Sequence, residues 1–231
     1  MQYLIIIGIF VLTIIILAFV YEFNIKKFKN FAKTEEESLN KLCEKYPSNI
    51  EICKYILKKL NNENVQIEED KNQKTCLYIA LTDKIVIADV KKSYTRIQTI
   101  AHECLHSIQD RKILLFNFIY SNVYLLYFII TFLLALFNKI PNKMLMLALM
   151  LFFSYIYYFV RSYLENDAMI KAKFLAKEYM EEIKISDKDE IDKIIESYDK
   201  LNNMGIKMTN FELLTETMIK IMVLAVVFYI R

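Results

Sequence analysis

The chain has 231 residues, enough for one sizeable domain, and 55% of them are hydrophobic, with only two glycines and two prolines. The apolar residues are concentrated in blocks, a pattern that indicates a membrane protein and excludes a single large water-soluble core. A net charge of +3, with lysines and acids interspersed, gives no reason to expect a nucleic-acid partner. We therefore expect an α+β integral membrane protein that is mainly helical, with three to four transmembrane helices.

The first apolar block runs from Leu4 to Val20 and is long enough to span a bilayer. A cleaved secretory signal is the alternative, but no positive residue precedes the block and no small-x-small cleavage site follows it. Residues 1–24 are therefore expected to form an uncleaved transmembrane anchor. A charged helix should follow from Phe28 to Glu44, and Pro47 should end it.

Residues 25–112 are predicted to form a cytoplasmic part that contains two further helices and a small sheet between them. Ser48 is a good N-cap for the first of these helices. Ser93 can cap the second, which should run from Tyr94 to Gln109. The apolar side of the first helix carries Ile52, Cys53, Ile56, Leu57 and Leu60.

The segment between these two helices has the alternation and β-branched content of a small sheet. Two or three strands are expected, at Val65–Ile67, Thr75–Leu81 and Lys84–Val90. The last two, which are joined by Thr82-Asp83, are the most strongly indicated strand pair.

The only two histidines of the chain, His102 and His106, lie four residues apart with Glu103 between them. Residues four apart share one face of a helix, with about 5–6 Å between their Cβ atoms, so both imidazoles can reach one metal ion. Glu103 is close enough to act on a metal-bound water. This is the H-E-x-x-H arrangement of zinc peptidases. Two unrelated surface histidines are the alternative, but chance would rarely place the only two in this register.

A transmembrane hairpin is predicted for residues 113–160. Ile113 to Phe137 and Met144 to Val160 are long apolar blocks, separated by the turn residues Asn138 to Lys143. No charged residue lies inside either block, which argues against an ion path and hence against a channel or transporter.

Residues 161–208 are predicted to form cytoplasmic helices. One should run from Tyr163 to Ile183, and a second, capped by Ser186, should cover residues 187–202 and end near Gly205. Residues 209–231 should form a C-terminal apolar helix that inserts into the membrane and opens with the capping box at 209–212.

The charges within this last helix leave its place open. Glu216 and Lys220 can pair at i,i+4. The helix either spans the bilayer with this pair near one interface or lies along the membrane surface.

A catalytic zinc needs three protein ligands and an open position for water, and without a third histidine a carboxylate must serve. The candidate is Glu165, which is expected to begin the helix after the hairpin. Two membrane crossings return the chain to the side it left, so Glu165 and the histidine helix should face the same compartment. Asp167 is the fallback ligand. The alternative is that both acids merely favour the first turn of a helix.

Basic residues near the ends of the apolar blocks indicate orientation. Most of them flank the polar segments and only two occupy the hairpin turn, which predicts cytoplasmic polar segments and an outside N-terminus. The four cysteines show no C-x-x-C spacing and are expected to be reduced thiols. The flanking residues are Lys26, Lys27, Lys29, Arg111, Lys112 and Arg161, against Lys139 and Lys143 in the turn.

The motif His102-Glu103-x-x-His106-Ser107-Ile108-Gln109, followed after a hydrophobic hairpin by Glu165-x-Asp167-Ala168, resembles the YugP-type neutral zinc metallopeptidases of bacterial membranes. It is more distantly similar to HtpX-type membrane gluzincins. The resemblance covers nearly the whole chain. It implies that His102, His106 and Glu165 bind one Zn²⁺ and that Glu103 is the catalytic base. One departure is Leu105, where the family usually has glycine, so the packing there must differ.

The expected function is therefore a membrane-bound zinc metalloendopeptidase of a bacterial-type cell membrane. It would hydrolyse a protein or peptide substrate at the cytoplasmic surface with a zinc-activated water. The alternative is a zinc-binding but inactive membrane adaptor. An intramembrane protease is disfavoured because Arg96, Gln98, Gln109 and Asp110 flank the motif within one helix length.

Two further expectations concern the substrate. By resemblance, the strand Lys84–Ala88 should be an edge strand that holds the substrate backbone by strand addition. The donor that stabilises the oxyanion should be a tyrosine or an arginine, and Tyr158, Arg161 and Tyr163 are near Glu165 in the sequence.

Overall fold

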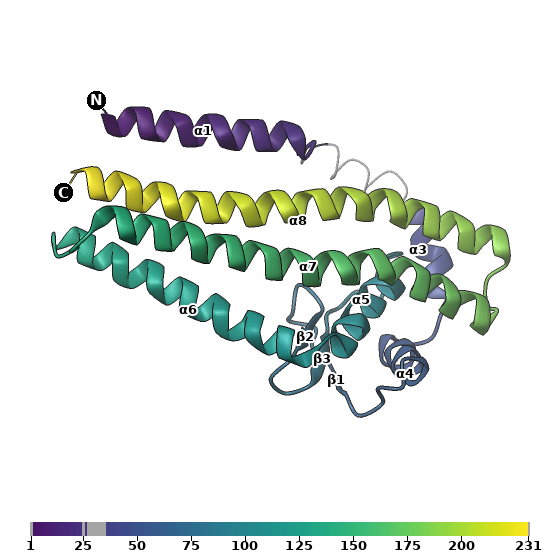
Figure 1. Cartoon of the computed structure of the whole chain (residues 1–231). Helices are drawn as coiled ribbons and strands as arrows, with labels where there is room; N and C mark the ends of the chain where they lie inside the picture. Colours follow the sequence, from purple (N-terminus) through teal and green to yellow (C-terminus); the bar gives the residue numbers. More distant parts are fainter. Residues whose placement is uncertain (1, 25, 27–35, 231) are drawn as a thin grey trace. The chain divides into compact units, whose positions relative to one another are not determined.

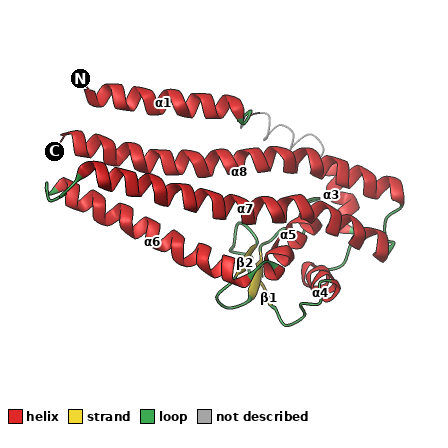
Figure 2. Ribbon diagram, in the orientation of Figure 1, coloured by secondary structure: helices red, strands yellow, loops and turns green. Residues whose placement is uncertain are grey.

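The computed structural model describes residues 2–24, 26 and 36–230. This part of the chain is mainly helical, with one small three-stranded sheet (Figures 1 and 2). The helices are α1 (Gln2–Val20), α3 (Glu36–Glu44), α4 (Asn49–Lys59), α5 (Arg96–Ile108), α6 (Arg111–Leu136), α7 (Lys143–Ile183) and α8 (Lys188–Ile230). The strands are β1 (Gln66–Glu69), β2 (Leu77–Ile79) and β3 (Lys84–Ile87). Of the helix expected at Phe28–Glu44, residues 28–35 lie outside the described residues, and α3 covers the remainder.

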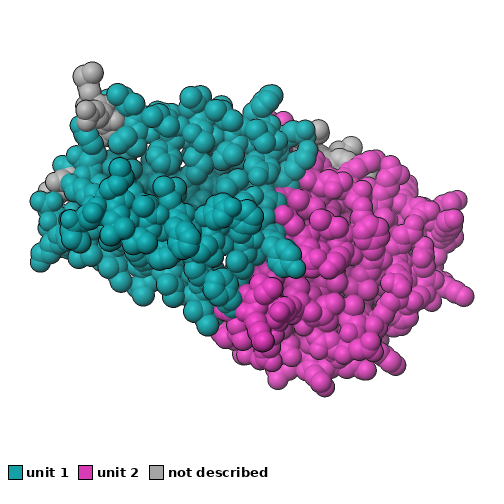
Figure 3. Space-filling model, in the orientation of Figure 1, with its two compact units in different colours: residues 1–23, 116–163, 207–231 teal, residues 24–115, 164–206 magenta. Residues whose placement is uncertain are grey.

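The chain divides into two compact units (Figure 3). Unit 1 comprises residues 1–23, 116–163 and 207–231, and unit 2 comprises residues 24–115 and 164–206. The chain passes from one unit to the other inside α6, α7 and α8, so each of these helices contributes to both units.

Unit 1 contains the apolar parts of the long helices. Tyr124 of α6 donates or accepts a 3.0 Å hydrogen bond with the Ser154 hydroxyl of α7, and Lys143 at the start of α7 donates to the Phe228 carbonyl of α8 at 2.8 Å. Around these bonds, Tyr124, Met150, Ile221 and Leu224 form a buried apolar cluster. The helices α6, α7 and α8 are each long and apolar enough to cross a membrane.

The first helix is shorter. The apolar stretch of α1 is Leu4–Val20, which has 17 residues, and α1 is not among the three helices long and apolar enough to cross a membrane. At 1.5 Å per residue it would cover about 25 Å, somewhat less than the roughly 30 Å hydrocarbon core of a bilayer. Its side chains Leu4, Ile9 and Phe19 are exposed, which suits contact with lipid better than contact with water.

The turn between α6 and α7 has the local structure that its sequence predicts. Asn138 adopts a positive φ of 52°, and the Lys139 N–H donates to the Leu134 carbonyl at 2.9 Å, which closes the end of α6. The Asn142 side chain then accepts from the Leu145 N–H at 3.0 Å and caps the start of α7. The predicted helical hairpin is therefore present.

Two predicted helix boundaries are wrong. The chain does not begin a new helix at Tyr163, because α7 is continuous through Ile183, and it does not break at Gly205, because α8 is continuous through Ile230. Gly205 has no positive φ, and a Cβ there would lie 3.1 Å from the Met169 side chain, so this glycine allows close packing of α8 on α7.

The capping box predicted at 209–212 does not begin a helix, because these residues lie inside α8. The buried Asn210 side chain accepts from the Ser162 hydroxyl at 2.5 Å and from the Tyr158 hydroxyl at 3.3 Å. These tertiary hydrogen bonds take the place of a cap. The start of α8 is also shifted, since Asp187 and not Ser186 accepts from the Glu190 N–H, at 2.8 Å.

The predicted pair within α8 does form. Glu216 and Lys220 make an i,i+4 salt bridge, and the Lys220 ammonium lies 4.7 Å from the centre of the Tyr124 ring. Both contacts compensate the charge of Lys220 within a helix that is apolar enough to span a membrane.

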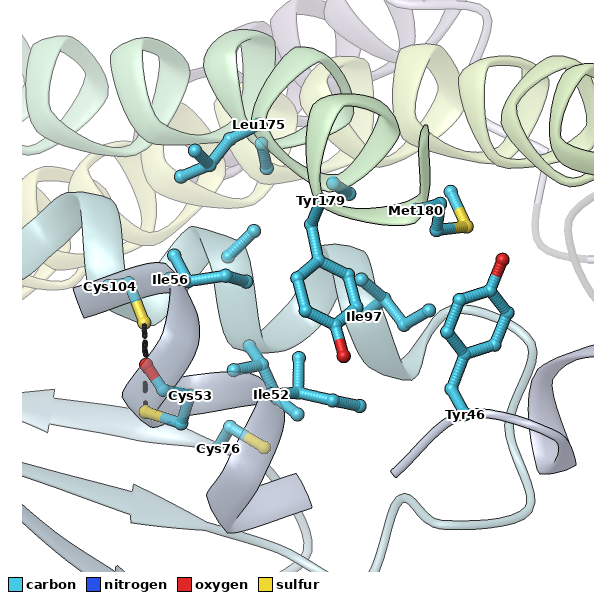
Figure 4. Packing of buried hydrophobic residues seen from close by; sticks show 14 of the residues in the cluster. Tyr46, Ile52, Cys53, Ile56, Cys76, Ile97, Cys104, Leu175, Tyr179 and Met180 are labelled. Carbon is cyan, nitrogen blue, oxygen red and sulfur yellow. Dashed lines mark hydrogen bonds between the residues drawn. The ribbon is translucent and has the colours of Figure 1, made fainter. Parts of the chain in front are cut away.

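Unit 2 has its own apolar core, part of which is shown in Figure 4. The predicted cap of α4 is present as a capping box between Ser48 and Glu51. Four of its five predicted apolar residues, Ile52, Cys53, Ile56 and Leu57, are buried, and the fifth, Leu60, is partly buried against the same core. Tyr179 and Leu175 of α7 extend towards α4 and α5, among side chains that include Ile56 and Ile97 (Figure 4).

The four cysteines are free and buried, as expected for reduced thiols. The Sγ atoms of Cys53 in α4 and Cys104 in α5 lie 3.6 Å apart inside this core.

The sheet of unit 2 has the strand order β1-β3-β2. Strand β3 pairs in parallel with β1, with Gln66 opposite Lys84, and antiparallel with β2, with Leu77 opposite Val86. The predicted strand pair is therefore present, as the antiparallel β2–β3 hairpin. The prediction that Lys84–Ala88 is an edge strand is wrong, because β3 is central and the edges are β1 and β2.

Candidate metal centre

The helix α5 positions both histidines through its packing. Its residues Ile97, Ile100 and Cys104 are fully buried in the core of unit 2, which leaves the two histidines at the border of that core. The helix begins at Arg96, two residues later than expected, and Ser93 instead accepts a hydrogen bond from the Thr95 N–H at 3.2 Å. Leu105, where the chain departs from the YugP-type pattern that it resembles, is also buried in the core and therefore has a packing role.

Three ligand atoms converge at this border. The Nε2 atoms of His102 and His106 are 3.0 Å apart, and the Oε2 atom of Glu165 lies 3.6 Å from the first and 3.7 Å from the second. Ligands held about 2.0–2.1 Å from one ion in a tetrahedron are separated by about 3.3–3.4 Å. The three side chains could therefore hold a metal ion, and they form such a group among the described residues.

Glu165 reaches the histidines from the interior of α7 (Lys143–Ile183). It does not lie in a first helical turn, so the alternative explanation of Glu165 and Asp167 as helix-start acids is wrong. Asp167 is not part of the group of three. Its carboxylate instead binds Lys171 at 2.6 Å, one helical turn further along α7.

Gln109 connects the two helices beside the site. Its Oε1 atom lies 2.8 Å from Nδ1 of His106, and its Nε2 atom donates to the Leu164 carbonyl at 2.9 Å and to Oδ2 of Asp167 at 3.2 Å. In the sequence, Gln109 is only a polar residue that follows the motif, with no predicted contact. Its distance of three residues from His106, one helical turn, was the signal that could have indicated a contact.

Glu103 lies beside the group and is buried, with 7% exposure. Burial raises the pKa of its carboxyl group, and the neighbouring His102 and His106 oppose this shift. The backbone N–H of Tyr78 in β2 also approaches the carboxyl group and lowers its pKa. No pattern in the sequence indicated that Tyr78 would lie here, because the contact depends on how the sheet packs on α5.

The electrostatics of His106 reflect its neighbours. Burial alone would lower the pKa of His106, but its contact with the Glu165 carboxylate and with Gln109 raises it. Burial would likewise raise the pKa of Asp167, yet Lys171 and Gln109 together lower it. Asp167 therefore carries its negative charge at neutral pH, which makes it an acceptor for Gln109.

The three candidates for an oxyanion donor belong to unit 1, whereas the site belongs to unit 2. The hydroxyl of Tyr158 already donates to Asn210, and it lies 3.5 Å from the hydroxyl of Tyr21. Nothing in the described site assigns the role to Tyr158, Arg161 or Tyr163.

Comparisons with protein-family profiles, with curated proteins and with solved structures find no match to this chain. The fold and the site by themselves define a mainly helical protein with three helices able to cross a membrane. They also define a His/His/Glu group that could hold a metal ion.

Proposed function

We propose that this protein is a membrane-bound zinc metalloendopeptidase that cleaves a protein or peptide substrate at the cytoplasmic membrane surface. The observation that carries the proposal is the convergence of His102, His106 and Glu165 with the buried carboxyl group of Glu103 beside them. Three apolar helices support the membrane location. The proposed reaction, hydrolysis of a peptide bond, is taken from the resemblance to YugP-type peptidases.

The donor set favours zinc among the common metals. Two imidazole nitrogens and one carboxylate oxygen are the ligands of a well-known class of catalytic zinc site, and they leave a fourth position for water. Zinc bound there would lower the pKa of its water from about 15.7 towards about 7 and polarise a substrate carbonyl.

Glu103 is proposed as the general base. It would accept a proton when the substrate carbonyl is attacked and return that proton to the leaving amine. Its burial supports this role, because a carboxyl group with a raised pKa releases an accepted proton less readily to water and can deliver it to the amine.

The outer edge of β2 is the proposed place for the substrate backbone. Strand β2 is an edge strand, and its Tyr78 N–H approaches Glu103. A peptide added to this edge would run past the proposed base, with its carbonyl groups near the ligand side chains.

The test combines metal analysis with hydrolysis on one preparation. The Glu103→Gln variant keeps the size of the side chain and removes its basicity. We expect it to retain one zinc per chain and to lose hydrolysis of an unfolded protein by about 10²–10⁴-fold. The Glu63→Gln variant, on an exposed loop residue, is the matched control and should behave as wild type.

The outcomes separate the two functions considered. A zinc-loaded Glu103→Gln variant that cleaves as fast as wild type would show that the proposed mechanism is wrong. Zinc binding by wild-type protein without cleavage of any unfolded or membrane-associated substrate would favour the inactive adaptor.

A further inference from the structure

Gln109 lies where α5 ends, and its side chain contacts both α5 and α7, the helices that carry the three candidate metal ligands. It follows the last residue of α5 and has an extended backbone, with φ −65° and ψ 158°. Its side chain contacts His106 on one side and the segment Leu164–Asp167 of α7 on the other. The same segment contains Glu165, so one amide side chain lies between two of the three candidate ligands.

The chemistry of an amide determines which way the Gln109 side chain points. Its NH₂ group only donates and its oxygen only accepts. The NH₂ group faces two acceptors, the Leu164 carbonyl at 2.9 Å and the Asp167 carboxylate at 3.2 Å. The reversed amide would bring its oxygen against both of these oxygens, which is repulsive. The oxygen of Gln109 therefore faces His106.

This orientation determines where the proton of a neutral His106 lies. An amide oxygen at 2.8 Å from Nδ1 can only accept, so Nδ1 must carry the proton. Nε2 is then the bare nitrogen, and it is Nε2 that faces His102 and Glu165. A metal ligand has to present a lone pair, so this tautomer is the one that can bind.

We propose that Gln109 is a positioning residue that holds His106 in the Nδ1–H tautomer, and that Asp167 acts through Gln109 and not as a metal ligand. The proposal rests on the metal site proposed above but not on its reaction. It assigns Asp167 a role different from that of Glu165, although the two residues are only two positions apart on α7.

The presence of only two histidines makes a direct measurement possible. In metal-free protein labelled with ¹⁵N-histidine, at a pH high enough that His106 is neutral, the two ring nitrogens of each residue report the tautomer by NMR, and the His106→Ala variant assigns the signals. We expect the Nδ1–H form of His106 in wild type. The Gln109→Met variant, similar in size but without the amide, should lose this preference.

The conservative variant separates positioning from packing. In Gln109→Glu one oxygen still accepts from Nδ1–H, but the other would repel the Leu164 carbonyl and the Asp167 carboxylate, so it is combined with Asp167→Asn, whose amide can donate to it. This double variant should retain the wild-type tautomer. Gln73→Met, at an exposed glutamine, is the matched control for the loss of an amide. Thermal unfolding midpoints for all variants show whether the fold is intact.

Zinc affinity supplies a second readout. Loss of a hydrogen-bonding partner of a metal-ligating histidine typically weakens binding by about 10–100-fold, which is the change expected for Gln109→Met. Asp167→Ala should have a smaller effect than Glu165→Ala. Equal effects would assign Asp167 as a ligand and overturn its proposed role.

The decisive result is independent of catalysis. If folded Gln109→Met keeps the Nδ1–H tautomer of His106 in the metal-free protein, the inference is wrong. If the tautomer changes as expected but wild-type protein binds no zinc, the inference about Gln109 stands and the proposed metalloenzyme does not.

Discussion

Glu165 and Asp167 show how two acids of the same helix take different roles when they are two positions apart. Side chains at this spacing point to different sides of a helix. Glu165 lies 3.6 Å from His102 and 3.7 Å from His106, whereas Asp167 binds Lys171 and Gln109. The residue that reaches both histidines is the better candidate for the third ligand.

Removal of the Glu165 carboxylate should therefore weaken metal binding strongly. We expect His106→Ala to lose nearly all bound zinc and Glu165→Ala to bind far more weakly than wild type, since each ligand contributes directly to the ion. Zinc content after dialysis against a weak chelator measures this. Glu196→Ala, with an exposed carboxylate on α8, serves as control. Undiminished stoichiometric zinc in Glu165→Ala would contradict the assignment.

At the scale of elements, α7 and α8 are longer than their sequence patterns predict. Glycine and a capping-box pattern normally indicate an end and a start of helices. Here Gly205 packs against Met169, and Asn210 binds Ser162 and Tyr158. Tertiary contacts use these residues for packing and hydrogen bonding, so the local signals do not end the helix.

The continuity of α8 predicts the effect of Gly205→Ala. Glycine inside a helix costs about 0.5–1 kcal/mol relative to alanine. The added methyl would meet only the flexible end of Met169, at 3.1 Å. We expect the variant to be as stable as wild type or slightly more stable in thermal unfolding, by up to about 1 kcal/mol. A clear loss of stability would instead indicate that the helix breaks at this position.

The strand order makes a separate prediction about the substrate. A photo-reactive residue at Thr75, exposed two residues before β2, should cross-link to a protein substrate more than one at Gln66, exposed on β1. Both should be placed in the Glu103→Gln variant, so that the substrate is not cut. Mass spectrometry of the cross-linked product is the measurement. Preferential cross-linking at Gln66 would place the substrate on the other edge of the sheet.

At the scale of the whole molecule, three helices are long and apolar enough to cross a membrane, and the basic residues follow a consistent bias. Arg111, Lys112 and Arg161 flank the polar segments, which predicts that those segments face the cytoplasm. The three candidate metal ligands would then lie on the cytoplasmic side of the membrane, and the turn between α6 and α7 on the opposite side.

Cysteine labelling of intact cells tests this orientation. Lys139→Cys, exposed in the turn, should react with a membrane-impermeant thiol reagent from outside, and Lys74→Cys, exposed in unit 2, should not. Wild type is a suitable control because its four cysteines are buried. Labelling of Lys74→Cys and not of Lys139→Cys would reverse the proposed topology.

Features that depend on neighbouring residues were predictable from the sequence alone. These include the register of His102 and His106 on one helix, the cap at Ser48, the turn at Asn138 and the β2–β3 hairpin. Each depends on a periodicity of a few residues or on the preference of one side chain for one backbone conformation. Such signals are complete within a short segment.

Features that depend on residues far apart in the chain were decided by tertiary structure. These are the central position of β3, the continuity of α7 and α8, the approach of Tyr78 to Glu103 and the amide bridge of Gln109. Several pairings satisfy the same local pattern, and only packing selects one of them. Hence the sequence by itself determined the pair of histidines, whereas the placement of Glu165 beside them depended on the packing of α7 against α5.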